Sequence, residues 1–355
     1  MSQQKRAYWL VAEILFAMLL VIVLSKSTAS GKENKSNTNF KITLPCQVPW
    51  RDPNHDQIFD ALCRNAIQLG LGVELVDDGD LRHLKKAYGI KGHLILPEYY
   101  SPLGPGLNNP RYGAAAVKIT EWAIDMVGSY GGGEVMAFVG YDHMDVGKAS
   151  SEPISLEEGA VNCIANLKKL AKFCNDPDHP ERKDVVVCLA MLNDRNFGDV
   201  PNTITNNYLN MKGYPGYQGN HLQWVANIVR AVDSPNIKLM FSCYDVFIMD
   251  CRTTKDLTTL MLKNKDIIGY ISVAQHECRS EINYFGGKAM INYIEVARAI
   301  RDMDYTGCVG LDYIPTKDPS GKPLTTETNP RFDETGNLLQ AIAILRGETT
   351  KTRSG

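Results

Sequence analysis

Carboxylate and imidazole side chains follow several short apolar runs of this sequence, and such groups build oxygen-rich metal sites or proton-transfer sites. They are Glu74, Glu98, Asp142, His143, Asp145, Asp245, His276, Glu277 and Asp312. Magnesium and manganese bind carboxylate oxygens, and positioned carboxylates or histidines transfer protons. Polar residues also begin ordinary solvated loops, so each position has a second interpretation. Glu74 is the most informative, because a carboxylate that ends an apolar strand needs a partner or water.

The elements that must position these residues alternate along the chain. Eight β-rich runs are predicted strands: Lys41–Leu44, Val73–Val76, His93–Leu96, Glu134–Val139, Asp184–Leu189, Ile237–Phe241, Ile267–Val273 and Gly307–Leu311. Helical periodicity separates them, with predicted apolar faces at Leu222, Val225, Val229, Val232 and at Ile291, Ile294, Ala297, Ile300. Eight alternations over roughly 300 residues predict a (β/α)8 TIM barrel, an α/β fold with its chemistry at the C-terminal strand ends. A doubly wound open sheet is the alternative, although glycine-rich nucleotide-binding motifs are absent.

The composition excludes several classes of protein. The chain has 355 residues, 44% of them hydrophobic, and Lys+Arg 38 against Asp+Glu 40 leaves a net charge of -2. Because nucleic-acid binding depends on phosphate neutralisation, no nucleic-acid partner is predicted.

The nine cysteines include no CxxC pair and often lie in apolar runs, which predicts reduced core residues. A Cys278 nucleophile beside His276 is an alternative for which no orienting third group can be assigned.

The N-terminus has the pattern of a targeting segment. Lys5 and Arg6 precede the apolar stretch Ile14–Leu24, and small residues follow at Ser27–Ala29. This order is typical of a cleaved signal peptide or a short signal anchor. We expect a signal segment at 1–29, a polar linker at 30–39, the barrel at 40–347 and a tail at 348–355. The expected location is membrane-anchored, through an uncleaved segment, or secretory and extracytoplasmic.

Three motifs in the C-terminal half occur in order at consecutive predicted strand ends. They are LNDR at 192–195, PNIKLMF at 235–241, and EINY at 281–284 followed by GLDYIP at 310–315. In this order they resemble hydroxypyruvate isomerase and its relatives among the xylose-isomerase-like TIM barrels. The resemblance covers roughly residues 184–315 and supports the barrel expected from strand and helix alternation.

The resemblance implies a metal-dependent aldose–ketose isomerase, with Mg or Mn and a small hydroxy-carbonyl or sugar ligand. It implies Asp312 and Glu281 as catalytic residues, and it implies substrate-binding roles for Glu74, Arg279, His276 and Asn193. The family's metal ligands fall on Ala190, Ser242, Asp245, Tyr270, Ser272 and Asp312. Of these, only Asp312 keeps a carboxylate where the family has one. The usual metal-dependent reaction is therefore predicted to be lost or altered.

Two classes of function stay open at this point. One is an isomerase or epimerase with a rebuilt site, for which Asp312, Asp245 and His143 are the candidate metal ligands. The other is a non-catalytic barrel that binds a small polyol or a protein partner. A divalent ion bound near Asp312 would distinguish the two classes, because carboxylate oxygens are the ligands such ions prefer.

Overall fold

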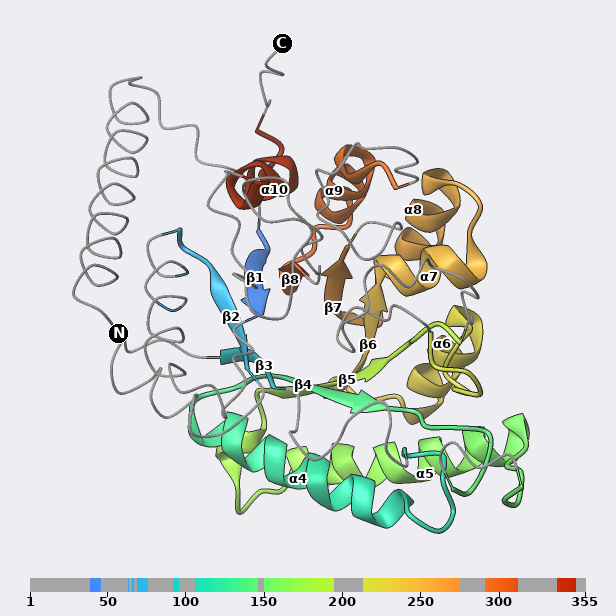
Figure 1. Ribbon diagram of the computed structural model, residues 1–355. Coiled ribbons are helices and arrows are strands. Elements are labelled where there is room, and N and C mark those ends of the chain that lie inside the picture. The colour runs from blue at the N-terminus through green and yellow to red at the C-terminus, as the bar shows by residue number, and fades with distance from the viewer. Residues whose placement is uncertain are drawn as a thin grey trace, which may run out of the picture. The chain divides into compact units, whose positions relative to one another are not determined.

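The computed structural model describes residues 39–45, 63, 66, 69–75, 92–95, 106–145, 150–194, 213–274, 291–311 and 337–348. Within these ranges, parallel strands follow one another around a closed barrel in the order β1 to β8 (Figure 1). The strands are β1 (Lys41–Pro45), β2 (Gly72–Leu75), β3 (Gly92–Ile95), β4 (Gly133–Phe138), β5 (Val185–Ala190), β6 (Ile237–Ser242), β7 (Ile268–Val273) and β8 (Cys308–Leu311).

The ring is closed by the pairing of the first strand with the last. Lys41 lies opposite Cys308 and Thr43 opposite Gly310, both in parallel register. This closure confirms the predicted TIM barrel and excludes the open doubly wound sheet. Each strand begins and ends within one residue of its predicted bounds. The predictions succeeded because barrel strands covered on both faces are nearly continuous in apolar residues.

Helices surround the strands, and several begin at side-chain caps. They are α4 (Gly113–Ser129), α5 (Leu156–Cys174), α6 (Leu222–Val232), α7 (Cys243–Asp250), α8 (Thr254–Lys263), α9 (Tyr293–Asp302) and α10 (Asn337–Arg346). Ser155 accepts a hydrogen bond from the Glu158 backbone at the start of α5. Thr253 and Asp256 form a reciprocal capping box at the start of α8. These caps fix where the helices start after the strand-end loops.

The predicted apolar faces agree with the structure in α6 and in part in α9. All four predicted residues of α6 are buried. In α9 the prediction of Ile294 was wrong, since this residue is 51% exposed. The helix begins only at Tyr293, and its buried face consists of Tyr293, Val296, Ala297, Ala299 and Ile300. Ile294 therefore lies one residue past Tyr293, on the side of the helix that faces solvent.

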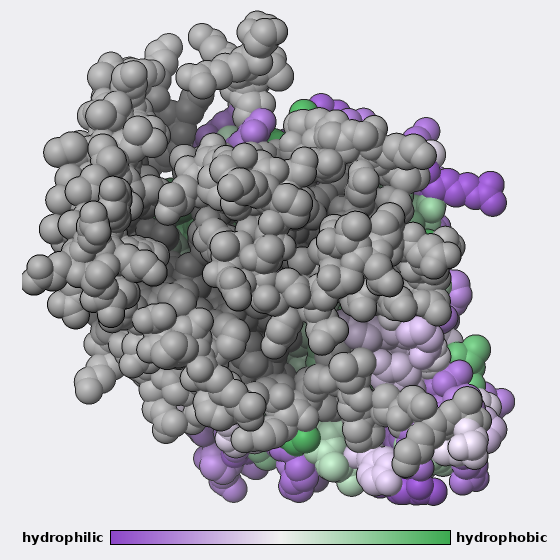
Figure 2. Space-filling model, in the orientation of Figure 1, coloured by the Kyte–Doolittle hydropathy of each residue, from purple (hydrophilic) through white to green (hydrophobic). Residues whose placement is uncertain are grey.

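The outer surface of α4 and α5 is mostly hydrophilic where it is visible along the lower edge of Figure 2, with separate hydrophobic spots. Trp122, Leu156 and Val161 are among the exposed apolar side chains of these helices. Their inner faces pack on the barrel core, as expected of amphipathic surface helices. Among the described helices, none is both long enough and apolar enough to span a bilayer. The predicted segment 1–29 lies outside the described residues.

Candidate functional site

Three strands contribute to a polar cluster inside the barrel, formed by Thr43, Glu74 and Tyr270 and called here the interior cluster. Thr43 Oγ1 donates to Glu74 Oε1 at 2.9 Å, and it lies 2.6 Å from the Tyr270 hydroxyl. Tyr270 also donates to Glu74 Oε1. Since β7 is a neighbour of neither β1 nor β2 in the sheet, these contacts cross the barrel interior. The sequence predicted that Glu74 needs a hydrogen-bond partner, and the structure provides two, the buried hydroxyls of Thr43 and Tyr270.

Burial and the negative charge of Glu74 raise the pKa of Tyr270 well above its ordinary value. Its hydroxyl therefore stays protonated and acts as a donor. Gly310 leaves the space that this pair occupies: a Cβ there would lie 2.2 Å from both Glu74 Oε1 and the Tyr270 hydroxyl. A substrate-binding role for Glu74 stays a prediction, while its contacts with the scaffold are now defined.

A second cluster, the rim cluster, joins the C-terminal ends of β5 and β6 through Asn193, Ser242 and Asp245. The Asn193 backbone N–H and side-chain Nδ2 donate to Asp245 Oδ1 at 3.0 and 2.7 Å. Ser242 Oγ donates to Asp245 Oδ2 at 2.5 Å. Asp245 is fully buried, and Ser242 also caps α7. Two residues predicted for the site, Asn193 and Asp245, are thus in direct contact.

The adjacent strand ends, β4 and β5, are joined by an aromatic side chain from a distant loop. The Tyr217 hydroxyl donates to the Ala190 carbonyl at 3.0 Å and accepts from the Val139 backbone N–H at 2.8 Å. Tyr217 is fully buried and packs edge-on against Tyr141, with ring centroids 5.8 Å apart. The backbone oxygen of Ala190 therefore accepts a hydrogen bond from Tyr217, and the methyl side chain of Ala190 cannot bind a metal ion.

The loop after β4 holds a carboxylate–imidazole pair. His143 Nδ1 lies 2.7 Å from Asp142 Oδ1, and the His143 side chain is 27% exposed. Backbone hydrogen bonds join Asp142 to Gly216 and to Ile154, so the pair is fixed between two other loop segments. Asp145 turns instead to Arg111, 3.6 Å away, in an exposed ion pair. The pairing of Asp142 with Nδ1 orients the His143 imidazole, so Nε2 is the ring nitrogen that remains available for chemistry.

The predicted metal set of Asp312, Asp245 and His143 is described only in part, because Asp312 lies outside the described residues. No group of three or more His, Cys, Asp or Glu side chains in these ranges is arranged to hold a metal ion. The family's Mg or Mn would need several oxygen ligands with charge. Ala190 supplies none, and the Ser242 and Tyr270 hydroxyls are engaged with Asp245 and Glu74. The described donors therefore do not fit the family's metal.

Six of the candidate site residues lie outside the described residues: Glu98, His276, Glu277, Arg279, Glu281 and Asp312. Cys46 and Cys278 also lie outside them. The seven cysteines that are described are free thiols, and six of them are buried, as predicted for residues of the core. Burial raises the pKa of six of these thiols, those of Cys163, Cys174, Cys188, Cys243, Cys251 and Cys308, and that of Cys251 rises to about 12. These six thiols are therefore poor nucleophiles.

The opposite, N-terminal end of the barrel holds a carboxylic acid with few partners. Glu134, on β4, has a buried Oε2 without a hydrogen-bond partner. Burial raises its pKa to about 7, and a hydrogen bond with the Cys308 thiol opposes this only in part. No ion pair with Glu134 occurs among the described residues. No sequence pattern distinguishes Glu134 from an ordinary residue at the start of a predicted strand.

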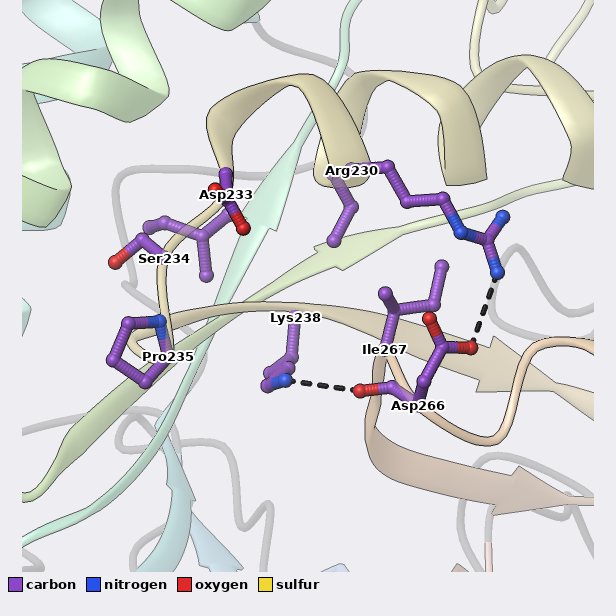
Figure 3. Close-up of a pocket in the computed structure, with 9 residues that line it drawn as sticks. Arg230, Asp233, Ser234, Pro235, Lys238, Asp266 and Ile267 are labelled. Atoms are coloured by element: carbon purple, nitrogen blue, oxygen red, sulfur yellow. Dashed lines mark hydrogen bonds and ion pairs between the residues drawn. The ribbon is translucent and has the colours of Figure 1, made fainter.

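A cavity of about 360 Å³ also lies at the N-terminal end, between the end of α6 and the starts of β6 and β7. Figure 3 shows Arg230 and Lys238 directed to the same residue, Asp266. Arg230 donates to Asp266 Oδ1 at 3.1 Å, and Lys238 Nζ donates to its backbone oxygen at 3.0 Å. The positive and negative side chains that line the cavity are equal in number, Arg230 and Lys238 against Asp233 and Asp266. Ligands of TIM barrels bind at the opposite, C-terminal end of the strands. We assign this cavity a structural role.

The chain matches the family model described as xylose isomerase-like TIM barrel over residues 65–332. A search of curated proteins finds no match. A family 2 AP endonuclease from Brucella melitensis is similar in structure, with 18% identity, coverage of 84% of this chain and 97% of that chain, and a TM-score of 0.59.

Two sugar epimerases are also similar in structure. The 3-keto-D-glucoside 4-epimerase from E. coli has 14% identity, coverage of 86% of this chain and 99% of its own, and a TM-score of 0.59. A D-psicose 3-epimerase with D-tagatose, from Clostridium cellulolyticum H10, has 14% identity, coverage of 87% and 99%, and a TM-score of 0.57. These low identities support the fold alone. The family match, which spans most of the chain and the strands from β2 to β8, shows that this protein belongs to the xylose isomerase-like TIM barrels.

Proposed function

We propose that this barrel binds a small sugar or hydroxy-carbonyl compound at the C-terminal ends of its strands, and that the hydroxypyruvate isomerase type of metal-dependent isomerisation is lost or altered. Family membership supports the ligand class, since structural neighbours are sugar epimerases and one was solved with D-tagatose. Ligands of TIM barrels bind at this end.

One observation carries the proposal. At Ala190, where the resemblance expects a metal-binding glutamate, the side chain is a buried methyl group and the backbone oxygen is held by Tyr217. Ser242, where an aspartate is expected, caps α7 and donates to Asp245. Proton transfer by a positioned carboxylate typically contributes about 10²–10⁴-fold in rate, and metal polarisation adds more. A site without both should be very slow in the family reaction.

The test compares metal binding and turnover in matched variants of the full chain. The double change Ala190→Glu with Ser242→Asp restores two carboxylates, and Ala190→Gln with Ser242→Asn has nearly the same volume without charge. We expect manganese affinity, measured by calorimetry, to rise at least about tenfold in the charged variant only. Native protein should convert no hydroxypyruvate to tartronate semialdehyde above background. Chelator-sensitive turnover by the native chain would overturn the proposal.

A second candidate function, an active isomerase or epimerase with a rebuilt site, is favoured by the Asp142–His143 pair. A histidine oriented through Nδ1 by a carboxylate can act through Nε2 as a base or a metal ligand. Under this alternative His143→Gln abolishes sugar epimerisation. His221→Gln is the matched control, because His221 pairs with Asp250 at 2.9 Å and is 58% exposed. Asp312 and Glu281 would then be the further catalytic residues, and Asp312→Ala should also abolish turnover.

We also propose that residues 1–29 direct the barrel to a membrane or across it. The basic residues Lys5 and Arg6 before the apolar stretch Ile14–Leu24 support this. Deleting residues 1–29 should leave a folded barrel in the soluble fraction, while the full chain should sediment with membranes or be recovered with a processed N-terminus. An intact N-terminus in the cytosolic fraction would contradict the proposal.

A further inference from the structure

The amide of Asn193 has a fixed orientation at the C-terminal end of β5. Its Nδ2 donates to Asp245 Oδ1, and its backbone N–H donates to the same oxygen. Ser242 holds the other carboxylate oxygen of Asp245. Turning the amide over would place Oδ1 against a carboxylate oxygen, which is repulsive. The hydrogen bonds therefore determine which atom of the amide faces away from Asp245, and that atom is Oδ1.

Asn193 Oδ1 has no hydrogen-bond donor, although Asn193 is only 2% exposed. A buried acceptor without a donor is destabilising, so each such atom needs an explanation. Three others occur in the described ranges, on Asn108, Asn264 and Glu134. Asn108 Oδ1 is packed against Gly140. Asn264 and Glu134 lie at the N-terminal end, at the close of α8 and the start of β4.

Asn193 differs from these three by its position. It follows β5 directly, at the end of the barrel where ligands of this fold bind, and it is braced by a buried carboxylate. We propose that Asn193 Oδ1 accepts a hydrogen bond from a hydroxyl group of the ligand, and that the ligand at this point is a neutral polyol or sugar. An anionic group, such as the carboxylate of hydroxypyruvate, has no proton to donate and would be repelled by Asp245. This assignment rests on the proposed function and deepens it.

The experiment measures binding of D-tagatose and D-fructose to the full chain by ligand-observed NMR. Asn193→Ala should lower the affinity at least about tenfold, the size of one well-placed hydrogen bond. Asn264→Ala is the matched control, because it removes a buried amide with the same missing donor at the far end of the barrel. It should leave the affinity within about twofold.

A series of monodeoxy D-fructose analogues tests the same contact without altering the protein. One analogue should lose about tenfold in affinity for the native chain and for Asn264→Ala, and it should lose nothing further for Asn193→Ala. Equal binding of every analogue, or equal effects of the two alanine variants, would overturn the assignment while leaving the proposed function intact; that result is expected if Oδ1 holds only a buried water. No sugar binding by the native chain would overturn both.

Discussion

Two glutamates in the same barrel, Glu74 on β2 and Glu134 on β4, have opposite surroundings. Glu74 is 5% exposed and receives hydrogen bonds from Thr43 and Tyr270. Glu134 has the Cys308 thiol as a weak partner, and its Oε2 has no partner at all. The comparison shows that burial alone does not decide the state of a carboxyl group. The donors that neighbouring strands provide decide whether it is a stable part of the scaffold or a proton-binding group.

The interior cluster around Glu74 depends on a glycine. Gly310→Ala would place a Cβ 2.2 Å from both Glu74 Oε1 and the Tyr270 hydroxyl. Because both groups are buried and mutually bonded, we expect the free energy of unfolding to fall by about 3 kcal/mol or more. Urea denaturation measures this change. Gly70→Ala is the control: Gly70 has φ 66° with open space around it, so only backbone strain of about 1 kcal/mol is added. Equal losses would mean that the packing around Glu74 is not tight.

The Glu134 site should make stability depend on pH. Its folded-state pKa of about 7 lies above the ordinary value of 4.5. The bound proton therefore stabilises the folded barrel fully below pH 4.5, and this contribution is lost as the pH rises to 7. The loss amounts to about 3 kcal/mol, since each pH unit contributes about 1.4 kcal/mol per proton. Urea denaturation at intervals between pH 5 and 7 measures it.

Glu134→Gln should remove this pH dependence and make the barrel more stable than the native chain at pH 7. Glu181→Gln is the control, because Glu181 is 43% exposed and hydrogen bonds lower its pKa. That variant should keep the native slope. Identical slopes in the native chain and Glu134→Gln would show that Glu134 does not bind a proton in the folded barrel over this pH range.

The fold of this chain could be predicted from the sequence because its signals are local. Apolar runs such as Val185–Ala190 and periodic faces such as that of α6 need only a few neighbouring residues to be recognised. The error at Ile294 arose at a helix start, where a shift of one or two residues changes which face is buried.

The partners of the site residues could not be predicted in the same way. Thr43 and Tyr270 are 227 residues apart in the chain, and their contact depends on how the closed barrel sets its register. Tyr217 reaches Ala190 from a loop whose path no sequence pattern specifies. The sequence did identify Asn193 and Asp245, since both follow strands. That they contact each other is known only from the structure.

Tyr270 provides a direct contrast with Glu134. Tyr270→Phe removes the hydroxyl that donates to Glu74, and hydrogen bonds to charged groups contribute about 1.5–3 kcal/mol. We expect a loss of about 2 kcal/mol. Burial and Glu74 hold the pKa of Tyr270 far above neutral, so this loss should not change between pH 5 and 8. Tyr305→Phe, which removes bonds to the neutral carbonyls of Gly269 and Cys308, should cost less. A loss at Tyr270 that varies with pH would show that Glu74 itself titrates in this range.

Asp266 shows how a third carboxylate behaves when water replaces protein donors. It is 61% exposed and pairs with Arg230, which is 36% exposed, at 3.1 Å. Arg230→Gln should lower the free energy of unfolding by less than about 1 kcal/mol, because exposed ion pairs gain little over hydration. Even this loss should shrink between low salt and about 0.5 M salt, where charges are screened. The Lys238 hydrogen bond to the Asp266 backbone oxygen remains in the variant. A salt-independent loss comparable to that of Tyr270→Phe would mean that the cavity beside Asp266 excludes water, and that this carboxylate belongs with Glu74 rather than with the solvated surface.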